Sequence, residues 1–161
     1  MARPQRMLPE DTARAILSQG TWGVLSTVGP DGAPYAVPVN YFYAPEENAL
    51  YFHCALQGRK VENIRANPRV AFTVVTHQRI IPEKLTPHYC SAIALGRAAV
   101  VEDPGQKADI LARLCRALAP GVGRPGENPC PALDVTTVVR ITVEELTGKA
   151  KAILDVAAKS E

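Results

Sequence analysis

Charge of one sign, long apolar runs and paired cysteines are all scarce in this sequence of 161 residues. The 18 basic and 16 acidic residues are well mixed, so no cluster indicates a nucleic-acid or membrane partner. No stretch approaches the ~18 apolar residues of a membrane span, and the first residues form no apolar export signal. We therefore expect a cytoplasmic protein with no nucleic-acid and no membrane partner.

Motifs for metal binding and for common catalytic chemistries are also absent. The histidines share no metal-ligand spacing, and we assign no metal site. No G-x-S-x-G, Walker loop, G-x-G-x-x-G or H-E-x-x-H occurs, so no motif supports a hydrolase or a Rossmann domain. The cysteines form no C-x-x-C pair, and we expect free thiols in a reducing compartment. They are Cys54, Cys90, Cys115 and Cys130.

What is present is a series of short apolar runs separated by turn residues. The length suits a single domain, residues 1–161, and the 47% hydrophobic content is enough for a real core. Six or seven strands with helices at the periphery indicate a mainly β fold built as a small antiparallel barrel. The predicted strands are 22–28, 33–43, 49–54, 69–76, 90–102 and 135–143. The predicted helices are 9–19, 61–67, 103–118 and 150–159, with loops at 77–89 and 119–133.

The second predicted strand carries a signal about the edge of the sheet. Before it, residues 29–32 combine a proline that presets φ with an aspartate and a glycine, which is typical of a tight turn. Pro34 and Pro38 then have the same parity, so both lack an N–H on the same side of the strand. We therefore expect the sheet to open at this strand.

The loop after Cys54 ends at Gly58-Arg59-Lys60, where a short helix is predicted to begin. Exposed N–H groups at a helix N-terminus and adjacent cations bind phosphate well. In the alternative interpretation, both cations are only solvated at a helix start, where positive charge is not favoured. The local sequence by itself leaves both interpretations open.

Other candidate positions lie on the predicted strands. Buried hydroxyls must bond either backbone carbonyls or ligand oxygens, and the first strand carries two. The backbone beside the open edge could serve the polar rim of a flat heterocycle. A histidine at a strand end is the only candidate for a catalytic side chain, although such a histidine is more often structural. These positions are Ser26 and Thr27, then Val37, Pro38 and Val39, and finally His53.

Taken as a set, several segments resemble a known family. They are Gly23-Val-Leu-Ser-Thr-Val28, Asp31-Gly-Ala-Pro-Tyr-Ala-Val-Pro-Val-Asn-Tyr41, Leu50-Tyr-Phe-His-Cys54, Gly58-Arg-Lys-Val-Glu-Asn-Ile64, Asn67-Pro68, Tyr89-Cys-Ser91 and Gly96. The set resembles the pyridoxamine 5′-phosphate oxidase-like FMN-binding split barrels, most closely their nitroimidazole-resistance branch. The resemblance covers roughly residues 8 to 150 and favours the phosphate interpretation of Arg59 and Lys60.

The resemblance implies a homodimer with FMN at the interface. Ser26, Thr27 and His53 would lie near the flavin, Val37–Val39 along its ring, and Arg59 and Lys60 at its phosphate. Tyr89 and Ser91 would complete the pocket of the partner subunit.

For activity, the resemblance implies an FMN-dependent oxidoreductase that reduces a small molecule such as a nitroaromatic or nitroimidazole compound. The alternative is a flavin- or haem-binding storage or sensor protein without turnover, and some relatives in this branch use haem or deazaflavin. The chain ends in 155–161 without the arginine-leucine motif of true pyridoxamine 5′-phosphate oxidases. We therefore do not expect vitamin B6 oxidation.

Overall fold

The computed structural model describes residues 4–121 and 133–151. Its strands are β1 (Met7–Leu8), β2 (Trp22–Val28), β3 (Pro34–Asn40), β4 (Phe42–Ala44), β5 (Ala49–Ala55), β6 (Arg69–Ile81), β7 (Thr86–Val100) and β8 (Thr136–Lys151). Its α-helices are α1 (Glu10–Gln19), α2 (Arg59–Ala66) and α3 (Pro104–Leu118). Four single 3₁₀ turns lie at Pro4–Arg6, Pro45–Glu47, Pro82–Lys84 and Leu133–Val135. None of the helices in these ranges is long and apolar enough to cross a membrane.

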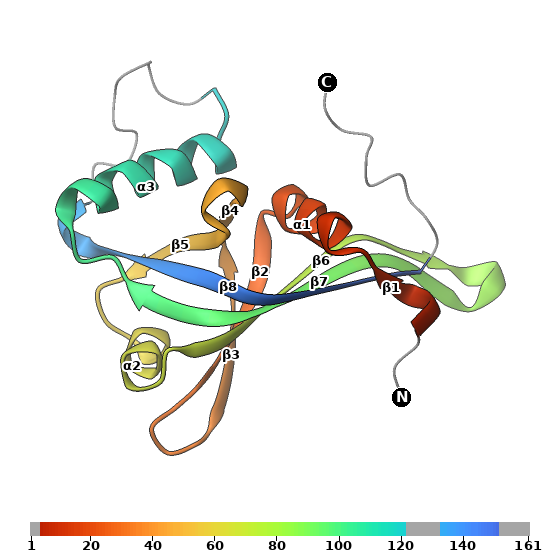
Figure 1. The fold of residues 1–161 in the computed structure, drawn as a ribbon, viewed down its shortest axis with the longest axis horizontal. Coiled ribbons are helices and arrows are strands. Elements are labelled where there is room, and N and C mark those ends of the chain that lie inside the picture. The colour runs from red at the N-terminus through yellow and green to blue at the C-terminus, as the bar shows by residue number, and fades with distance from the viewer. Residues whose placement is uncertain (1–3, 122–132, 152–161) are drawn as a thin grey trace.

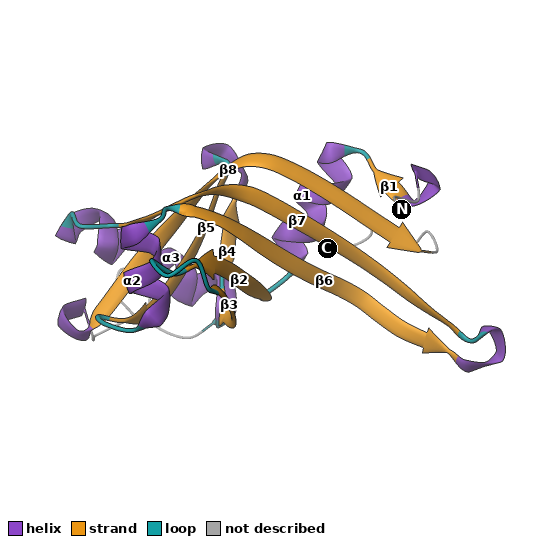
Figure 2. Ribbon diagram, turned by 90° about the horizontal axis from the view of Figure 1, so that it is seen from below, coloured by secondary structure: helices purple, strands orange, loops and turns teal. Residues whose placement is uncertain are grey.

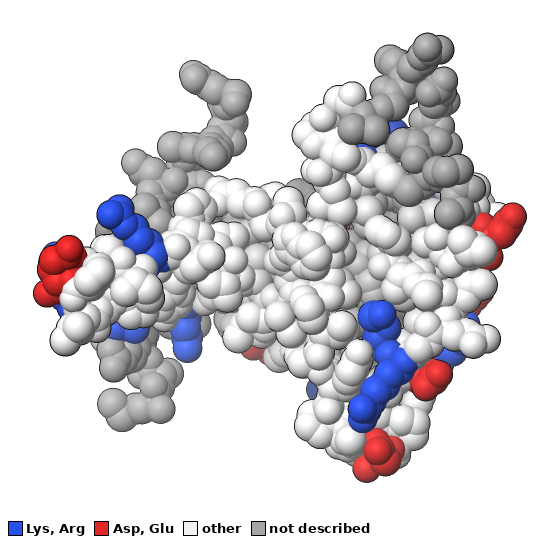
Figure 3. All heavy atoms as spheres, turned by 180° about the vertical axis from the view of Figure 1, so that it is seen from behind, with Lys and Arg blue, Asp and Glu red and all other residues white. Residues whose placement is uncertain are grey.

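All strands belong to one antiparallel sheet in the order β3-β2-β6-β7-β8-β5-β4, with β1 pairing β8. The sheet curls strongly without closing, and β3 and β4 are its end strands (Figures 1 and 2). This confirms the predicted mainly β split barrel. Strands β6 and β7 continue as a two-stranded arm beyond the body of the molecule, and its tip carries charged side chains (Figure 3).

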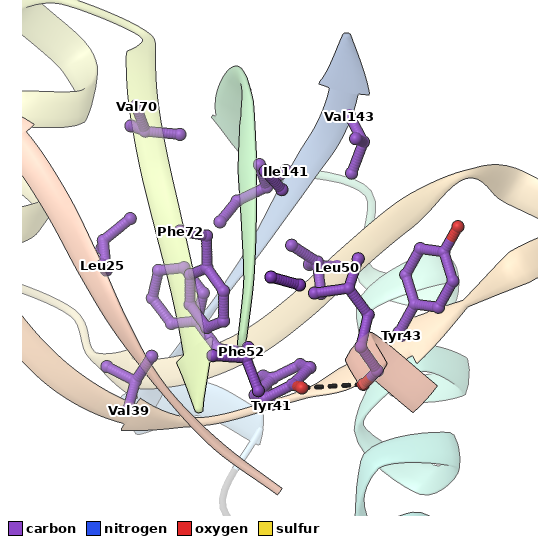
Figure 4. Close-up of a cluster of buried hydrophobic side chains, with 14 of the residues drawn as sticks. Leu25, Val39, Tyr41, Tyr43, Leu50, Phe52, Val70, Phe72, Ile141 and Val143 are labelled. Atoms are coloured by element: carbon purple, nitrogen blue, oxygen red, sulfur yellow. Dashed lines mark hydrogen bonds between the residues drawn. The ribbon is translucent and has the colours of Figure 1, made fainter. Parts of the chain in front are cut away.

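The main core lies inside the curl of the sheet. Alternate residues of β2, β5, β6 and β8 point inward, which buries Leu25, Phe52, Phe72 and Ile141 completely. Helix α1 covers one end with its buried apolar face, Ala13, Ile16 and Leu17. The buried Tyr41 hydroxyl donates to the Leu17 carbonyl at 2.7 Å, so this polar group is satisfied inside the core (Figure 4).

Helix α3 packs on the outside of β4, β5 and β8 through a second cluster that includes Ile110, Leu111, Tyr51 and Val138. Its N-cap is Asp103, whose Oδ1 accepts a hydrogen bond from the Gln106 N–H at 2.8 Å.

An ion-pair network joins α3 to the turn before β5. Arg113 pairs with Glu47 at 2.6 Å and with Glu46 at 2.8 Å, and its guanidinium lies over the Phe42 ring. The Tyr51 hydroxyl donates to the second Glu47 oxygen. This hydrogen bond, followed by the one from Arg113, lowers the pKa of Glu47.

The predicted loop at 77–89 is wrong, because most of it forms the arm of the β6–β7 hairpin. Ile80 pairs with Pro87 and Ile81 with Thr86, and a 3₁₀ turn beginning at Pro82 closes the hairpin. A register shift between Thr76 and Arg79 accommodates His77 at φ 54°. Both faces of this arm are largely exposed, so its strands lack the apolar alternation that marks a half-buried strand.

The last predicted strand is too short, since β8 runs on to Lys151 beside the long β7. The predicted helix at 150–159 is therefore wrong at Ala150 and Lys151, which are in β8, and its remainder lies outside the described residues. A register shift between Leu95 and Gly96 marks a β-bulge in the pairing of β7 with β8. A Cβ at Gly96 would lie 2.0 Å from the Thr142 carbonyl oxygen, so close strand approach requires glycine here.

Candidate functional site

The candidate site begins at two unpaired strand edges. Strand β3 is an end strand, and Pro34 and Pro38 lie opposite Val28 and Val24 of β2. In an antiparallel pair, alternate residues direct both backbone polar groups away from the partner. The prolines occupy these outward positions, and Ala36 between them directs its N–H to the open edge. This confirms that the sheet opens at the strand with the two prolines.

The matching edge belongs to β5. Strand β4 pairs with Ala49–Tyr51 only, so within the described chain the rest of β5 pairs on one side, with β8. Strands β3 and β5 approach each other without forming a ladder. The split in the barrel therefore lies between these two edges.

Helix α2 begins directly after β5, at the end of this split. Gly58 is its N-cap with φ 132° and ψ 162°, a conformation that residues with a side chain rarely adopt. The Gly58 carbonyl accepts from Val61 and Glu62, and the helix begins with Arg59 and Lys60. The N–H groups of Arg59 and Lys60, the first two residues, have no acceptor within the helix. The predicted combination of helix N-terminus and two cations is thus present.

The two cations have different surroundings. The exposed Arg59 guanidinium lies 5.0 Å from the centre of the Tyr35 ring, a cation–π contact that orients it over β3. Lys60 is half-buried near Cys54. Burial raises the pKa of the Cys54 thiol, and the positive charge of Lys60 opposes this only in part. Cys54 is therefore a neutral thiol rather than a nucleophile.

Thr27 joins the first core strand to α2. Its side chain is 3% exposed, and its hydroxyl accepts from Asn63 Nδ2 at 2.9 Å and donates to the Tyr35 carbonyl at 3.4 Å. Asn63 is itself 2% exposed. This pair fixes the position of α2, and through it the position of the two cations, relative to β2.

Ser26 points to the opposite, outer face of β2. There it lines a cavity of about 290 Å³ together with Arg69, Leu95 and Glu144. Glu144 reaches this cavity because the bulge at Gly96 leaves it without a partner in the β7–β8 register. Thr27 also borders this cavity, but its hydroxyl is directed inward to Asn63.

Residues 37–39 and His53 complete the set of predicted positions on β3 and β5. Val39 is buried in the core, Val37 packs against it, and Pro38 is exposed at the open edge. Val37 and Val39 lie opposite Leu25 and Gly23, so their backbone groups turn toward β2. His53 is exposed on the face of β5 opposite Cys54, away from Lys60.

Tyr89 and Ser91 lie at the far end of the sheet from α2. Ser26 pairs with Ala71 of β6, which pairs with Leu95 of β7, so these residues form one row across the strands. Ser91 is four residues before Leu95 on β7 and therefore lies about 13 Å from this row along the strand. The Ser91 hydroxyl donates weakly to the Lys149 carbonyl at 3.5 Å. One chain therefore brings Thr27, Arg59 and Lys60 together and leaves Tyr89 and Ser91 apart from them.

The outer surface of β2, β6 and β7 is apolar, and we call it the outer sheet face. Trp22 is 59% exposed and Val75 is 54% exposed. Val24 of β2 pairs with Thr73 of β6, and Thr73 pairs in turn with Ile93 of β7. Seen from behind, the middle of the molecule shows few charged atoms (Figure 3). Its exposed apolar side chains are Trp22, Val24, Val28, Val75, Ile93 and Leu95.

Sequence reasoning missed Tyr35 and Asn63. Tyr35 is directly opposite Thr27 in the β2–β3 register, and Asn63 is one helical turn after Arg59 on α2. An asparagine on the apolar side of a short helix was the available signal for a buried polar contact.

The open antiparallel sheet, with a short helix beginning beside its split, defines a split-barrel protein. The chain belongs to the pyridoxamine 5′-phosphate oxidase family, whose model matches residues 9–150. No significant match was found among curated proteins.

Solved structures share this fold. A candidate 5-nitroimidazole antibiotic resistance protein from Bacteroides thetaiotaomicron is 22% identical, with 89% of this chain and 86% of that chain covered and a TM-score of 0.75. A FAD-binding protein from Mesorhizobium loti is 25% identical, with 91% and 98% covered and a TM-score of 0.65. The FAD and heme binding protein from Mycobacterium smegmatis is 16% identical, with 95% and 79% covered and a TM-score of 0.74.

Proposed function

We propose that this protein is a flavin-dependent oxidoreductase that binds the FMN moiety of its cofactor at the start of α2. The observation that carries this proposal is the pair Arg59 and Lys60 directly after the Gly58 cap. A phosphate dianion is tolerable at a protein surface that excludes water only with paired cations and hydrogen-bond donors. The first turn of α2 supplies both, and the Tyr35 ring holds Arg59 over β3.

The ring of the flavin then lies along the open edge of β3. Pro38 presents an exposed, flat apolar surface there, and Ala36 and Pro38 direct backbone polar groups toward the edge. These features match a flat heterocycle with a polar rim. The bound flavin supplies the redox chemistry, so the residues of the chain need only bind, orient and shield it. His53 is the candidate for substrate contact.

The proposed assembly is a homodimer with the cofactor at the interface. The outer sheet face exposes six large apolar side chains, an arrangement that marks interaction surfaces in soluble proteins. Ser91 lies on this face and Tyr89 has the same parity on β7. Since one chain keeps them about 13 Å from the row of Ser26, a second copy related by a two-fold axis is the simplest way to bring them to the site.

For the substrate, we propose small nitroaromatic or nitroimidazole compounds. Support comes from the fold shared with the candidate nitroimidazole resistance protein. The exposed Pro38 gives the open edge of β3 an apolar surface, and the two cations at the start of α2 are assigned to phosphate. A neutral, flat substrate suits such a site better than a charged one.

The first test is the visible spectrum of the purified protein, together with mass analysis of the ligand released on denaturation. We expect a flavin spectrum and a flavin mass. The reduced protein should then be mixed anaerobically with a 5-nitroimidazole in a stopped-flow instrument. Rapid return of the oxidised flavin spectrum supports the proposed reaction, whereas a reduced protein that persists through many minutes contradicts it.

The second candidate is a flavin- or haem-binding protein that stores or senses its ligand without turnover. It is favoured by the exposed His53 beside the split and by the fold shared with the FAD and heme binding protein. A haem Soret band that is lost in His53→Ala would select this candidate. A deazaflavin mass in the released ligand would instead change the cofactor and leave the site in place.

A further inference from the structure

A cavity of about 320 Å³ lies where α2 ends and α3 begins, and we call it the α2–α3 cavity. Its walls come from the loop between β5 and α2, the last turn of α2, the end of β7, the first turn of α3 and the start of β8. None of the positions assigned to the flavin lines it. Its volume is at the lower end of the range for small-molecule sites, so it suits a small ligand.

One wall of the cavity carries a buried hydroxyl that the protein leaves without a partner. Thr137 on β8 is only 6% exposed, and its side chain makes no hydrogen bond with any residue that the structure describes. In the same part of the chain, every enclosed side-chain oxygen or nitrogen has a partner. The Thr137 hydroxyl is therefore open to the cavity that this residue lines. Buried hydroxyls in proteins are normally hydrogen-bonded, so a ligand oxygen is a suitable partner for this one.

Three charged side chains from different segments line the same cavity. They are Arg65 of α2, Lys107 of α3 and Glu102 of the segment between β7 and α3. None of them forms an ion pair within residues 4–121 and 133–151. Lys107 donates to the Leu133 carbonyl, a neutral acceptor that holds its ammonium beside the wall. Two cations and one carboxylate give the lining a net charge of +1, which a monoanion would balance.

The rest of the wall supplies apolar surface. Leu56 comes from the loop after β5, and Val100 and Val101 come from the end of β7 and the residue after it. Leu56 is 46% exposed, so a ligand that covers it removes apolar surface from water. The cavity thus combines cations and a hydroxyl donor with an apolar wall, which suits an anion that has an apolar body.

We propose that the α2–α3 cavity binds a small monocarboxylate with an apolar body. Arg65, Lys107 and the Thr137 hydroxyl are the donors to the carboxylate, and the apolar body lies against Leu56 and Val101. Glu102 disfavours a second carboxylate on the ligand, because like charges that meet in a site repel. The site is separate from the start of α2 and does not depend on the proposed flavin chemistry.

The test is isothermal titration of the full chain with hexanoate, its neutral amide hexanamide, and the dianion adipate, which has the same carbon chain length. Hexanoate should bind at least tenfold more tightly than the other two. Arg65→Ala should weaken hexanoate about tenfold, as expected for a lost charged contact at an exposed side chain. Thr137→Val keeps the branched shape of the side chain and should weaken hexanoate about fivefold. Arg116→Ala, at an exposed position of α3, is the matched control and should leave hexanoate affinity unchanged.

Glu102→Gln tests the charge argument in the opposite direction. It should tighten adipate at least threefold and change hexanoate less than adipate, and unchanged urea unfolding of the variants shows that they fold. Absence of saturable hexanoate binding to wild type would overturn the proposal. Equal affinity for hexanamide and hexanoate, or equal affinities of Arg65→Ala and Arg116→Ala, would do the same. A protein that binds hexanoate but no flavin would overturn only the proposed function, so the two failures are distinguishable.

Discussion

Replacing Arg59 and Lys60 together by alanine should remove most of the affinity for FMN. The two residues open α2 immediately after Gly58, and together they provide the positive charge at the split of the barrel. A hydrogen bond to a charged group contributes about 1.5–3 kcal/mol. Because Arg59 is exposed, the low end applies to it. We expect a combined loss of about 3 kcal/mol, or about 100-fold in Kd.

The measurement is a fluorescence titration of cofactor-free protein with FMN and, in parallel, with riboflavin. Riboflavin lacks the phosphate, so wild type and double variant should bind it equally. Arg116→Ala serves as a control for the loss of positive charge elsewhere on the surface. An unchanged FMN affinity in the double variant would show that the phosphate lies elsewhere and that the proposed position of the cofactor is wrong.

Tyr35 offers an internal check on this reasoning. Its ring lies 5.0 Å from the Arg59 guanidinium, and a cation–π contact at an exposed site contributes about 0.5–1 kcal/mol. Tyr35→Leu should therefore weaken FMN only a few-fold in wild type. In the Arg59→Ala background the same change should have no further effect on FMN affinity, and an additive effect would argue against this role.

Three further predictions concern stability and assembly. Asn63→Ala removes the buried donor that joins α2 to β2 and should lower the free energy of unfolding by about 2 kcal/mol in urea titration, whereas a change below about 0.5 kcal/mol would contradict this role. The pKa of Glu47 is lowered in the folded state, so its ionised carboxylate stabilises the fold above pH 4.5, and this contribution is lost as pH falls through the lowered value. Glu47→Gln should therefore flatten the acid dependence of the free energy of unfolding. Glu46→Gln, at a more exposed carboxylate of the same network, should not. Val24→Glu on the outer sheet face should give monomers in analytical ultracentrifugation, while Val135→Glu should not; a wild-type monomer at micromolar concentration with ligand bound would refute the dimer.

Several elements could be predicted from the sequence because their causes are local. The N-cap of α3 needs only an aspartate three residues before an exposed N–H, and the Asp103–Gln106 bond is present. The turn before β3 needs a residue that adopts positive φ, and Gly32 has φ 77°. The open edge at β3 follows from two prolines of equal parity. The family resemblance also depends on the linear order of residues, and the family model confirms it.

The arm and the full length of β8 could not be predicted in this way. An exposed strand is stabilised by its hydrogen-bonded partner and not by an apolar alternation, so its sequence resembles that of a loop. Lys151 is in a strand because it pairs with Tyr89, which lies 62 positions earlier in the chain. Such pairing is visible only when both strands are placed.

The candidate site shows the same division. The sequence by itself determined that Gly58, Arg59 and Lys60 begin a helix after a strand, because capping and charge are local properties. Only the tertiary structure decided that Thr27 turns inward to Asn63 while Ser26 faces the outer cavity, since strand alternation assigns a face only once the core side is known. It also placed the Tyr35 ring against Arg59, because this contact depends on packing between segments that are distant in the chain.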